Sequence, residues 1–271
     1  MMIKFLNRTN GQYSDSEVYW KVSINGNAQT HSIADQPLFD MPANSAGRIY
    51  FYLGSADSQY SDFIEYTIGA TQFNGNTTRV DAFGIKVAIL LHCADGYEVM
   101  VGENPATFAE DRAATFQRFI NAVPVEFQYL AQIQAPYKIV EPGAGEFGAG
   151  GQYADYYDNY VDEIWETNEL TIPKPGPNAS GLAAYPDLSA AIYRHTAAPG
   201  SFATDGTLLD TTMWVNSDDF YLQAPADYYA KFWHDNAING KAYGFPYDDV
   251  GGYSSFISHN NPQYLLVAIG W

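Results

Sequence analysis

The two ends of this chain alternate apolar with polar residues, whereas its middle places apolar residues three and four positions apart. VYWKVSI at 18–24 alternates, and YLLVAI at 264–269 has the composition of a buried strand. Strand side chains repeat every two residues and helical ones every 3.6, so a change of period marks a change of structure. The sequence therefore predicts a mainly β protein. We expect a β barrel or sandwich formed by residues 1–95 together with 241–271, and a mixed α/β subdomain inserted over residues 96–240.

Three amphipathic helices are expected in the inserted part. The first begins near Thr107, with Glu110 completing a capping box, and it stops before Pro124. Apolar residues at three- and four-residue spacing predict a second helix over about 153–168. A third begins near Pro225 and ends by residue 240. Each helix has one apolar face, so we expect each to pack by that face.

Composition limits the partners and cofactors of the chain. Thirteen basic against 31 acidic residues give a formal charge of −18, which repels phosphate backbones and anionic lipid surfaces. No apolar run reaches the roughly 18 to 20 residues needed to cross a bilayer. We therefore expect neither nucleic acid nor a membrane as partner. The single cysteine, Cys93, excludes an internal disulfide and is expected to be a small buried residue. The five histidines show no zinc-ligand spacing, so no metal site and no cofactor are expected.

The best candidate chemistry lies between residues 62 and 91. DFIEYTI at 62–68 predicts a half-buried strand, and the Asn-Gly pair in QFNGNTT predicts a turn into a second strand from about residue 79. Glu65 and Asp81 then face each other across the hairpin. Two carboxylates that flank one bond are what acid/base hydrolysis of a glycoside requires. The alternative is that both are ordinary polar residues on a solvated sheet face.

Four separated segments stand out along the chain: GRIYFYLG (47–54), DFIEYTI (62–68), TTRVDAFGIKVAI (77–89) and YGFPYDDVGGYSSF (243–256). They resemble the thaumatin-like fold, and specifically glycoside hydrolase family 64, the laminaripentaose-producing β-1,3-glucanases. The resemblance implies a thaumatin-like β barrel or sandwich with a wide groove between it and the α/β subdomain. It implies that Glu65 is the general acid and Asp81 the general base. Plant thaumatin-like proteins carry many disulfides, so the resemblance is to the glucanase branch.

The resemblance also implies a substrate and a reaction. We expect inverting, endo-type hydrolysis of linear β-1,3-glucan, such as laminarin or curdlan, to oligosaccharides such as laminaripentaose. By resemblance Thr67 and Thr78 hydrogen-bond sugar hydroxyls. Arg48 and Arg79 are candidates for charge balance beside the acidic groove, and Arg79 is counted with the substrate-binding residues because it lies next to the base.

Two other functions remain open on the sequence alone. The same groove can hold β-glucan without cutting it, which would make the chain a non-catalytic binding protein. An acidic surface can also contact a basic protein partner. Polymeric glucan is extracellular to most consumers, so we expect a secreted monomer. The beginning, MMIKFLNRTNGQYSD, lacks a signal-peptide core, which implies that the signal peptide is not part of this sequence.

Overall fold

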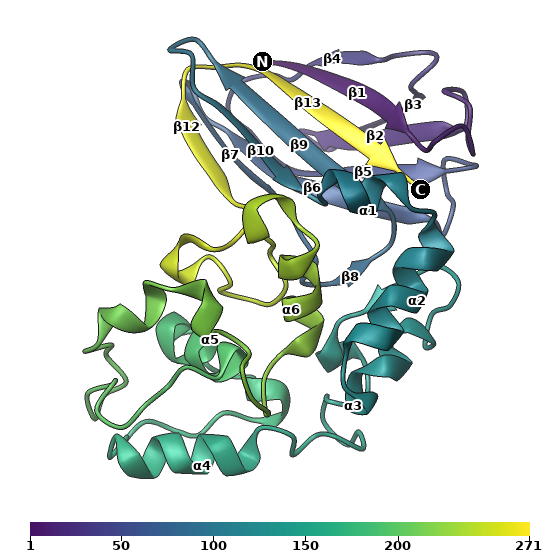
Figure 1. Ribbon diagram of the computed structural model, residues 1–271. Helices are drawn as coiled ribbons and strands as arrows, with labels where there is room; N and C mark the ends of the chain where they lie inside the picture. Colours follow the sequence, from purple (N-terminus) through teal and green to yellow (C-terminus); the bar gives the residue numbers. More distant parts are fainter.

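The computed structural model describes residues 1–271, and two β-sheets form its upper part in Figure 1, with most of the helices below them. The five-stranded sheet contains, in spatial order, β10 (Glu98–Gly102), β9 (Lys86–Cys93), β13 (Pro262–Gly270), β1 (Met2–Arg8) and β4 (Leu38–Asp40). The six-stranded sheet contains β12 (Ile257–Asn260), β7 (Gln72–Thr77), β6 (Ser61–Ile68), β5 (Ser45–Leu53), β2 (Val18–Ile24) and β3 (Asn27–Ser32). The prediction of a mainly β fold that unites both ends of the chain is confirmed, because β1 pairs in parallel with β13.

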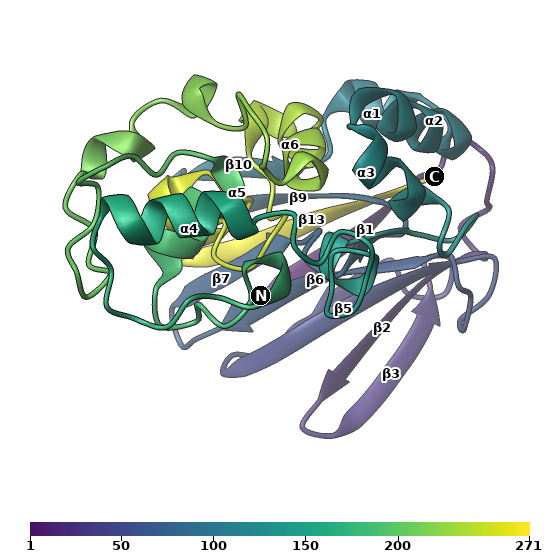
Figure 2. The ribbon, with the colours of Figure 1, turned by 90° about the horizontal axis from the view of Figure 1, so that it is seen from below.

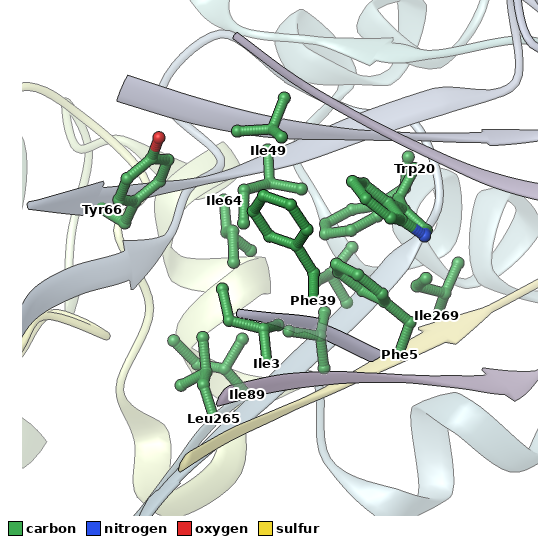
Figure 3. Close-up of a cluster of buried hydrophobic side chains, with 14 of the residues drawn as sticks. Ile3, Phe5, Trp20, Phe39, Ile49, Ile64, Tyr66, Ile89, Leu265 and Ile269 are labelled. Atoms are coloured by element: carbon green, nitrogen blue, oxygen red, sulfur yellow. The ribbon is translucent and has the colours of Figure 1, made fainter. Parts of the chain in front are cut away.

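A hydrophobic core of 25 buried residues fills the space between the two sheets. Figure 3 shows aromatic and aliphatic side chains from both sheets meeting there. Phe5 and Trp20 stack with ring centroids 4.7 Å apart. In β6, Ile64, Tyr66 and Ile68 point into this core, as the alternation predicts. Each large apolar side chain contributes about 1.5 to 3 kcal/mol on full burial, so the core fixes which face of β6 points outward.

The helical part has two further hydrophobic cores, of 18 and 13 buried residues. Its helices are α1 (Pro105–Ala109), α2 (Arg112–Ala122), α3 (Val125–Gln128), α4 (Asp158–Thr167), α5 (Pro186–Arg194) and α6 (Tyr228–Asp235). Short 3₁₀ turns occur at Tyr129–Ala131, Pro142–Ala144, Pro177–Ala179, Thr211–Trp214, Ser217–Asp219, Ile238–Gly240 and Val250–Gly252. In Figure 2 the hairpin of β2 and β3 projects away from all six helices. None of the helices is long and apolar enough to cross a bilayer.

The first predicted helix is two helices. Asn104 accepts a hydrogen bond from the backbone of Thr107 and caps α1, while Asp111 caps α2 through the backbone of Ala114. The predicted capping box at Thr107 is therefore wrong, because an Asn and an Asp with extended backbone begin the helices. The helix α5 was not predicted at all.

The turn expected at the Asn-Gly pair is also misplaced. Asn74 and Gly75 lie inside β7, and the chain reverses earlier, where the amide of Gly69 donates to the carbonyl of Gln72. Gly75 is needed for close packing, because a Cβ there would lie 2.8 Å from the carbonyl oxygen of Glu65. Asp81 consequently lies in the connection between β7 and β8 (Ala82–Phe83), and not on a long second strand.

Two contacts link the β part to the residues predicted as an insertion. The strand β10 pairs with β9, although it follows the predicted boundary at residue 95. The short strand β8 pairs with β11 (Ile139–Val140) from the helical part. The loop that carries Asp81 is thus held between both parts of the molecule.

Candidate active site

The side chains of Glu65 and Asp81 both reach solvent on the outer side of the six-stranded sheet. Glu65 lies near the middle of β6, where its neighbours Ile64 and Tyr66 point into the core, so alternation turns Glu65 outward. Asp81 reaches the same place from the connection after β7. The side chains are 40% and 56% exposed. A polymer can therefore approach both carboxylates without a change in the fold.

Arg48 joins the two carboxylates. It lies directly opposite Glu65 on the neighbouring strand β5. Its Nη2 is 2.9 Å from Glu65 Oε1, its Nε donates to the same oxygen at 3.0 Å, and its Nη1 donates to Asp81 Oδ2 at 3.2 Å. The ring of Phe63 supports the guanidinium, whose central carbon lies 4.1 Å from the ring centroid. One arginine thus brings together the two acids that the sequence predicted as a pair.

These ion pairs are exposed, and that determines how firmly they hold. Water and salt compete with a surface ion pair, which typically contributes about 0.2 to 1 kcal/mol. The contacts between Arg48 and the carboxylates can therefore be exchanged for contacts with a ligand at small cost.

Two adjoining hollows meet at Arg48 and Glu65. The first has a volume of about 360 Å³ and is lined by Thr67, Asn74, Asn76 and Phe256 among others. The second has a volume of about 250 Å³, and its lining is Arg48, Glu65, Thr78, Val80, Asp81, Tyr243, Pro246 and Tyr247. Since they share Arg48 and Glu65, the hollows adjoin at these residues, and we refer to the two together as the groove.

The two threonines predicted to bind sugar lie in different hollows. Thr67 is exposed and shares the outward face of β6 with Glu65. Thr78 lines the second hollow but is only 4% exposed, and its hydroxyl accepts a hydrogen bond from the amide of Val80. Thr67 is thus free to meet a ligand, whereas Thr78 shapes the bend that leads to Asp81.

The structure contradicts the expectation that Arg79 contacts the substrate. Its side chain is 3% exposed and forms salt bridges with Asp62 at 2.7 Å and Glu103 at 2.6 Å. Burial alone would lower the pKa of Arg79, but these two carboxylates outweigh it and raise that pKa. Asp62 also accepts from the amide of Gly84 at 2.9 Å. Arg79 and Asp62 therefore fix the loop on both sides of Asp81 from beneath.

Asn76 is a groove residue that the sequence reasoning missed. It pairs with Glu65 across β6 and β7, and its Nδ2 lies 3.4 Å from Glu65 Oε2. Its side-chain oxygen is buried and has no hydrogen-bond partner in the protein. Reading the Asn-Gly pair as a turn hid this residue, since only a strand over Gln72–Thr77 places it opposite Glu65.

Two larger hollows lack this arrangement. One of about 550 Å³ contains a single carboxylate, Asp111, which caps α2. Another of about 420 Å³ contains Asp218 and Asp235, but Asp235 is paired with Lys231. Each is larger than either hollow of the groove, but neither contains two carboxylates that are bridged by one arginine as Glu65 and Asp81 are.

Comparisons with known proteins point to one family. A family model described as β-1,3-glucanase, glycoside hydrolase family 64, matches residues 55–174 and 173–269. The crystal structure of a family 64 laminaripentaose-producing β-1,3-glucanase from Paenibacillus barengoltzii is similar with a TM-score of 0.81 and 30% identity, over 100% of this chain and 75% of that one. Its complex with laminarihexaose gives the same values.

Two further relatives are more limited guides. A family 64 β-1,3-glucanase domain from Clostridium beijerinckii has a TM-score of 0.79 over 100% of this chain and 98% of that one, and at 23% identity it shows the fold alone. A glucan endo-1,3-beta-glucosidase from Cellulosimicrobium cellulans is 40% identical over 82 residues. Those residues are 30% of this chain and only 13% of that protein.

Proposed function

Because this chain belongs to the glycoside hydrolase family 64 β-1,3-glucanases, we propose that it hydrolyses linear β-1,3-glucan with Glu65 and Asp81 as catalytic carboxylates. The observation that carries the assignment of these residues is the groove in which both acids contact Arg48. The Paenibacillus barengoltzii relative is a laminaripentaose-producing β-1,3-glucanase, and one of its structures is a complex with laminarihexaose. By this similarity the substrates are chains such as laminarin or curdlan, cut internally to oligosaccharides such as laminaripentaose.

The proposed mechanism inverts the anomeric carbon. Protonated Glu65 donates its proton to the glycosidic oxygen, while ionised Asp81 takes a proton from a water that attacks from the opposite side of the sugar. The glycosidic bond breaks as the bond to water forms, so no covalent intermediate is needed. Inverting pairs are about 6.5 to 9.5 Å apart, because the water must fit between the sugar and the base. The reaction needs no cofactor.

Arg48 must change partners during this reaction. A guanidinium favours an ionised carboxylate, whereas a general acid has to hold a proton. We therefore infer that the bound sugar displaces Arg48 from Glu65, and that Arg48 stays with Asp81, which acts as an anion. The exposed position of Arg48 supports this step, since its ion pairs are weak enough to exchange.

The division of the chain belongs to the same proposal. We propose a thaumatin-like sandwich formed by residues 1–95 with 241–271 and a mixed α/β insertion over 96–240, except that β10 is counted with the sandwich because it pairs with β9. The lining of the two hollows comes from residues 47–81 and 243–256, so both ends of the chain that make up the proposed sandwich contribute to the groove. We also propose that the protein acts as a secreted monomer, since its substrate is a polymer found outside cells.

The test is to incubate the protein with laminarin and with curdlan, and to follow the soluble sugars by chromatography and proton NMR. Hydrolysis should release oligosaccharides whose first detectable anomer is α, before mutarotation mixes the anomers. Asp81→Ala should abolish this release. An initial β-anomer would show retention and remove Asp81 from the role of base. Binding to curdlan without any released sugar would instead identify a β-glucan-binding protein.

A further inference from the structure

Three metal-ligating side chains meet at one end of the sandwich, outside the groove. Cys93 is the last residue of β9, Asp95 lies in the turn from β9 to β10, and His259 lies in β12. The thiol sulfur, a carboxylate oxygen and an imidazole nitrogen of these residues all lie within 4.8 Å of one another. The sequence spacing gave no sign of this cluster, because His259 is far from the other two residues along the chain.

The strand register explains why the three side chains converge. His259 pairs with Phe73, which is fully buried between the sheets, so His259 points to the inner side of the six-stranded sheet. Cys93 is fully buried at the edge of the core. Glu65 points to the outer side of the same sheet, so the cluster and the groove lie on opposite faces.

Hydrogen bonds and stacking hold the cluster in place without a ligand. The amide of Cys93 donates to the carbonyl of Tyr97 at 2.9 Å, and Asp95 Oδ1 accepts from the amide of Tyr97 at 3.0 Å. The ring of Tyr97 stacks on His259 with centroids 3.8 Å apart and planes within 8°. His259 Nε2 lies 2.9 Å from Asp95 Oδ2. Asp95 and His259 are thus held next to each other, with the thiol sulfur of Cys93 within 4.8 Å of their ligand atoms.

We propose that Cys93, Asp95 and His259 bind one divalent zinc-like ion, with water as the fourth ligand. Thiolate, imidazole and carboxylate are the donors that zinc uses, whereas calcium and magnesium require oxygen ligands. Zinc bonds of about 2.0 to 2.3 Å in a tetrahedron place donor atoms roughly 3.5 Å apart, so small side-chain rotations suffice. The side chain of Asp95 is 51% exposed and the side chain of His259 is 27% exposed. An ion can therefore reach these ligands from solvent, and a water can complete its coordination.

The ion would join the two sheets. Cys93 belongs to the five-stranded sheet and His259 to the six-stranded sheet, so one metal would connect them at the end of the sandwich. Its role would be structural, because the groove lies on the other face. Zinc binds the thiolate form of cysteine, so metal binding releases the thiol proton.

Cobalt(II) is the probe for this site, because its absorption spectrum depends on the type and geometry of its ligands. When the metal-free protein is titrated with Co²⁺, binding should saturate at one equivalent of Co²⁺ per protein. The bound ion should show the visible absorption bands of tetrahedral Co²⁺ and a near-ultraviolet thiolate-to-cobalt band. Excess Zn²⁺ should remove these bands and raise the melting temperature. Asp95→Asn and His259→Gln should weaken Co²⁺ binding at least tenfold, and Cys93→Ala should remove the thiolate band.

The matched control is His92→Gln. His92 lies next to Cys93 but pairs with Glu98, and it is not part of the cluster. This variant should bind Co²⁺ like the wild type, and Asp95→Asn should hydrolyse laminarin at the wild-type rate, which separates this inference from the proposed function. Absence of the thiolate band in the wild type would overturn the proposal. So would Co²⁺ binding that survives both Asp95→Asn and His259→Gln.

Discussion

Two clusters of one arginine, one aspartate and one glutamate lie on opposite faces of β6. The buried cluster is Arg79 with Asp62 and Glu103, and the exposed cluster is Arg48 with Glu65 and Asp81. Asp62 and Glu65 are three positions apart on one strand, so alternation sends one inward and the other outward. The same residue types consequently meet two different environments within a few residues of each other.

Burial decides what each cluster does. Arg79 is saturated by protein groups, because it also donates to the carbonyls of Thr78 and Ile85. Charges buried in a medium of low dielectric attract strongly, and breaking one such pair leaves another charge without a partner. Arg48 has solvent on one side, so its contacts are weak and can be replaced by those of a sugar. The buried cluster holds the loop of Asp81 in shape, and the exposed cluster is left available for chemistry.

The largest difference between the two clusters is expected when the carboxylate that each contributes from β6, Glu65 or Asp62, is neutralised. Glu65→Gln should reduce hydrolysis of laminarin by about 10²- to 10⁴-fold, since general acid catalysis contributes that much, while curdlan binding and stability are kept. Asp62→Asn should instead lower the midpoint of urea unfolding, and it should reduce the hydrolysis rate per folded molecule much less than Glu65→Gln does. Undiminished turnover in Glu65→Gln would remove Glu65 from the mechanism.

The next largest effect is expected from Arg79→Met. This change leaves Asp62 and Glu103 buried without their common partner, so we expect a loss of about 3 to 5 kcal/mol in the free energy of unfolding. Urea unfolding followed by tryptophan fluorescence measures it. A loss below about 1 kcal/mol would mean that water reaches this cluster and that the contrast between the two clusters is false.

Asp227 shows what burial does to a carboxylate without an arginine partner, because it is buried, caps α6 and forms no salt bridge with an arginine. Burial raises the pKa of Asp227 to about 7 in the folded protein.

The pKa of an aspartate in the unfolded chain is about 4, so between pH 4 and pH 7 the folded state keeps a proton on Asp227 that the unfolded state has lost. The free energy of unfolding therefore falls as the pH rises from about 4 to 7. Asp227→Asn keeps the cap and removes the charge. The stability of the wild type relative to the variant should therefore drop by up to about 4 kcal/mol between pH 4 and pH 8. A constant difference in urea midpoint across this range would contradict the raised pKa.

The smallest effect is expected from Arg48→Gln. Its ion pairs are exposed, so the free energy of unfolding should fall by less than about 1 kcal/mol, and added salt should reduce the difference. If Arg48 stabilises ionised Asp81 during catalysis, kcat should nevertheless fall while the fold persists. Destabilisation as large as that of Arg79→Met would show that the groove arginine is also structural.

The sequence predicted the orientation of the side chains in β6 better than the structure around this strand. Alternation placed Glu65 outward correctly, because the hydrophobic core behind β6 leaves only one register. The sequence did not show that Arg48, and not Arg79, would contact the two carboxylates, since a basic residue two positions before Asp81 can turn to either side of an irregular loop. Asn76 was hidden for a related reason, because the Asn-Gly pair serves close packing in β7 and not a turn.

The helical part was harder to predict, for physical reasons that differ between helices. The α4 helix has one polar face, and its predicted span of about 153–168 is close to the observed Asp158–Thr167. In α5 every residue from Leu188 to Arg194 is buried, so no polar face marks it as a helix. The break between α1 and α2 depends on competition between caps, and Asp111 with its extended backbone outweighs the helical period.

The parallel pairing of β1 with β13 has a consequence for how the protein is made. The strand β13 lies between β9 and β1 in its sheet, yet it comes after all the other strands of this fold in the sequence. Pairings between residues far apart in sequence form late, because the closing loop must first lose its freedom. Until β13 is in place, β1 and β9 each lack one of their two neighbouring strands and present an open edge, and open edges are sites of aggregation. Before β13 pairs, these two edges are therefore sites of this sheet that can add a strand from another chain.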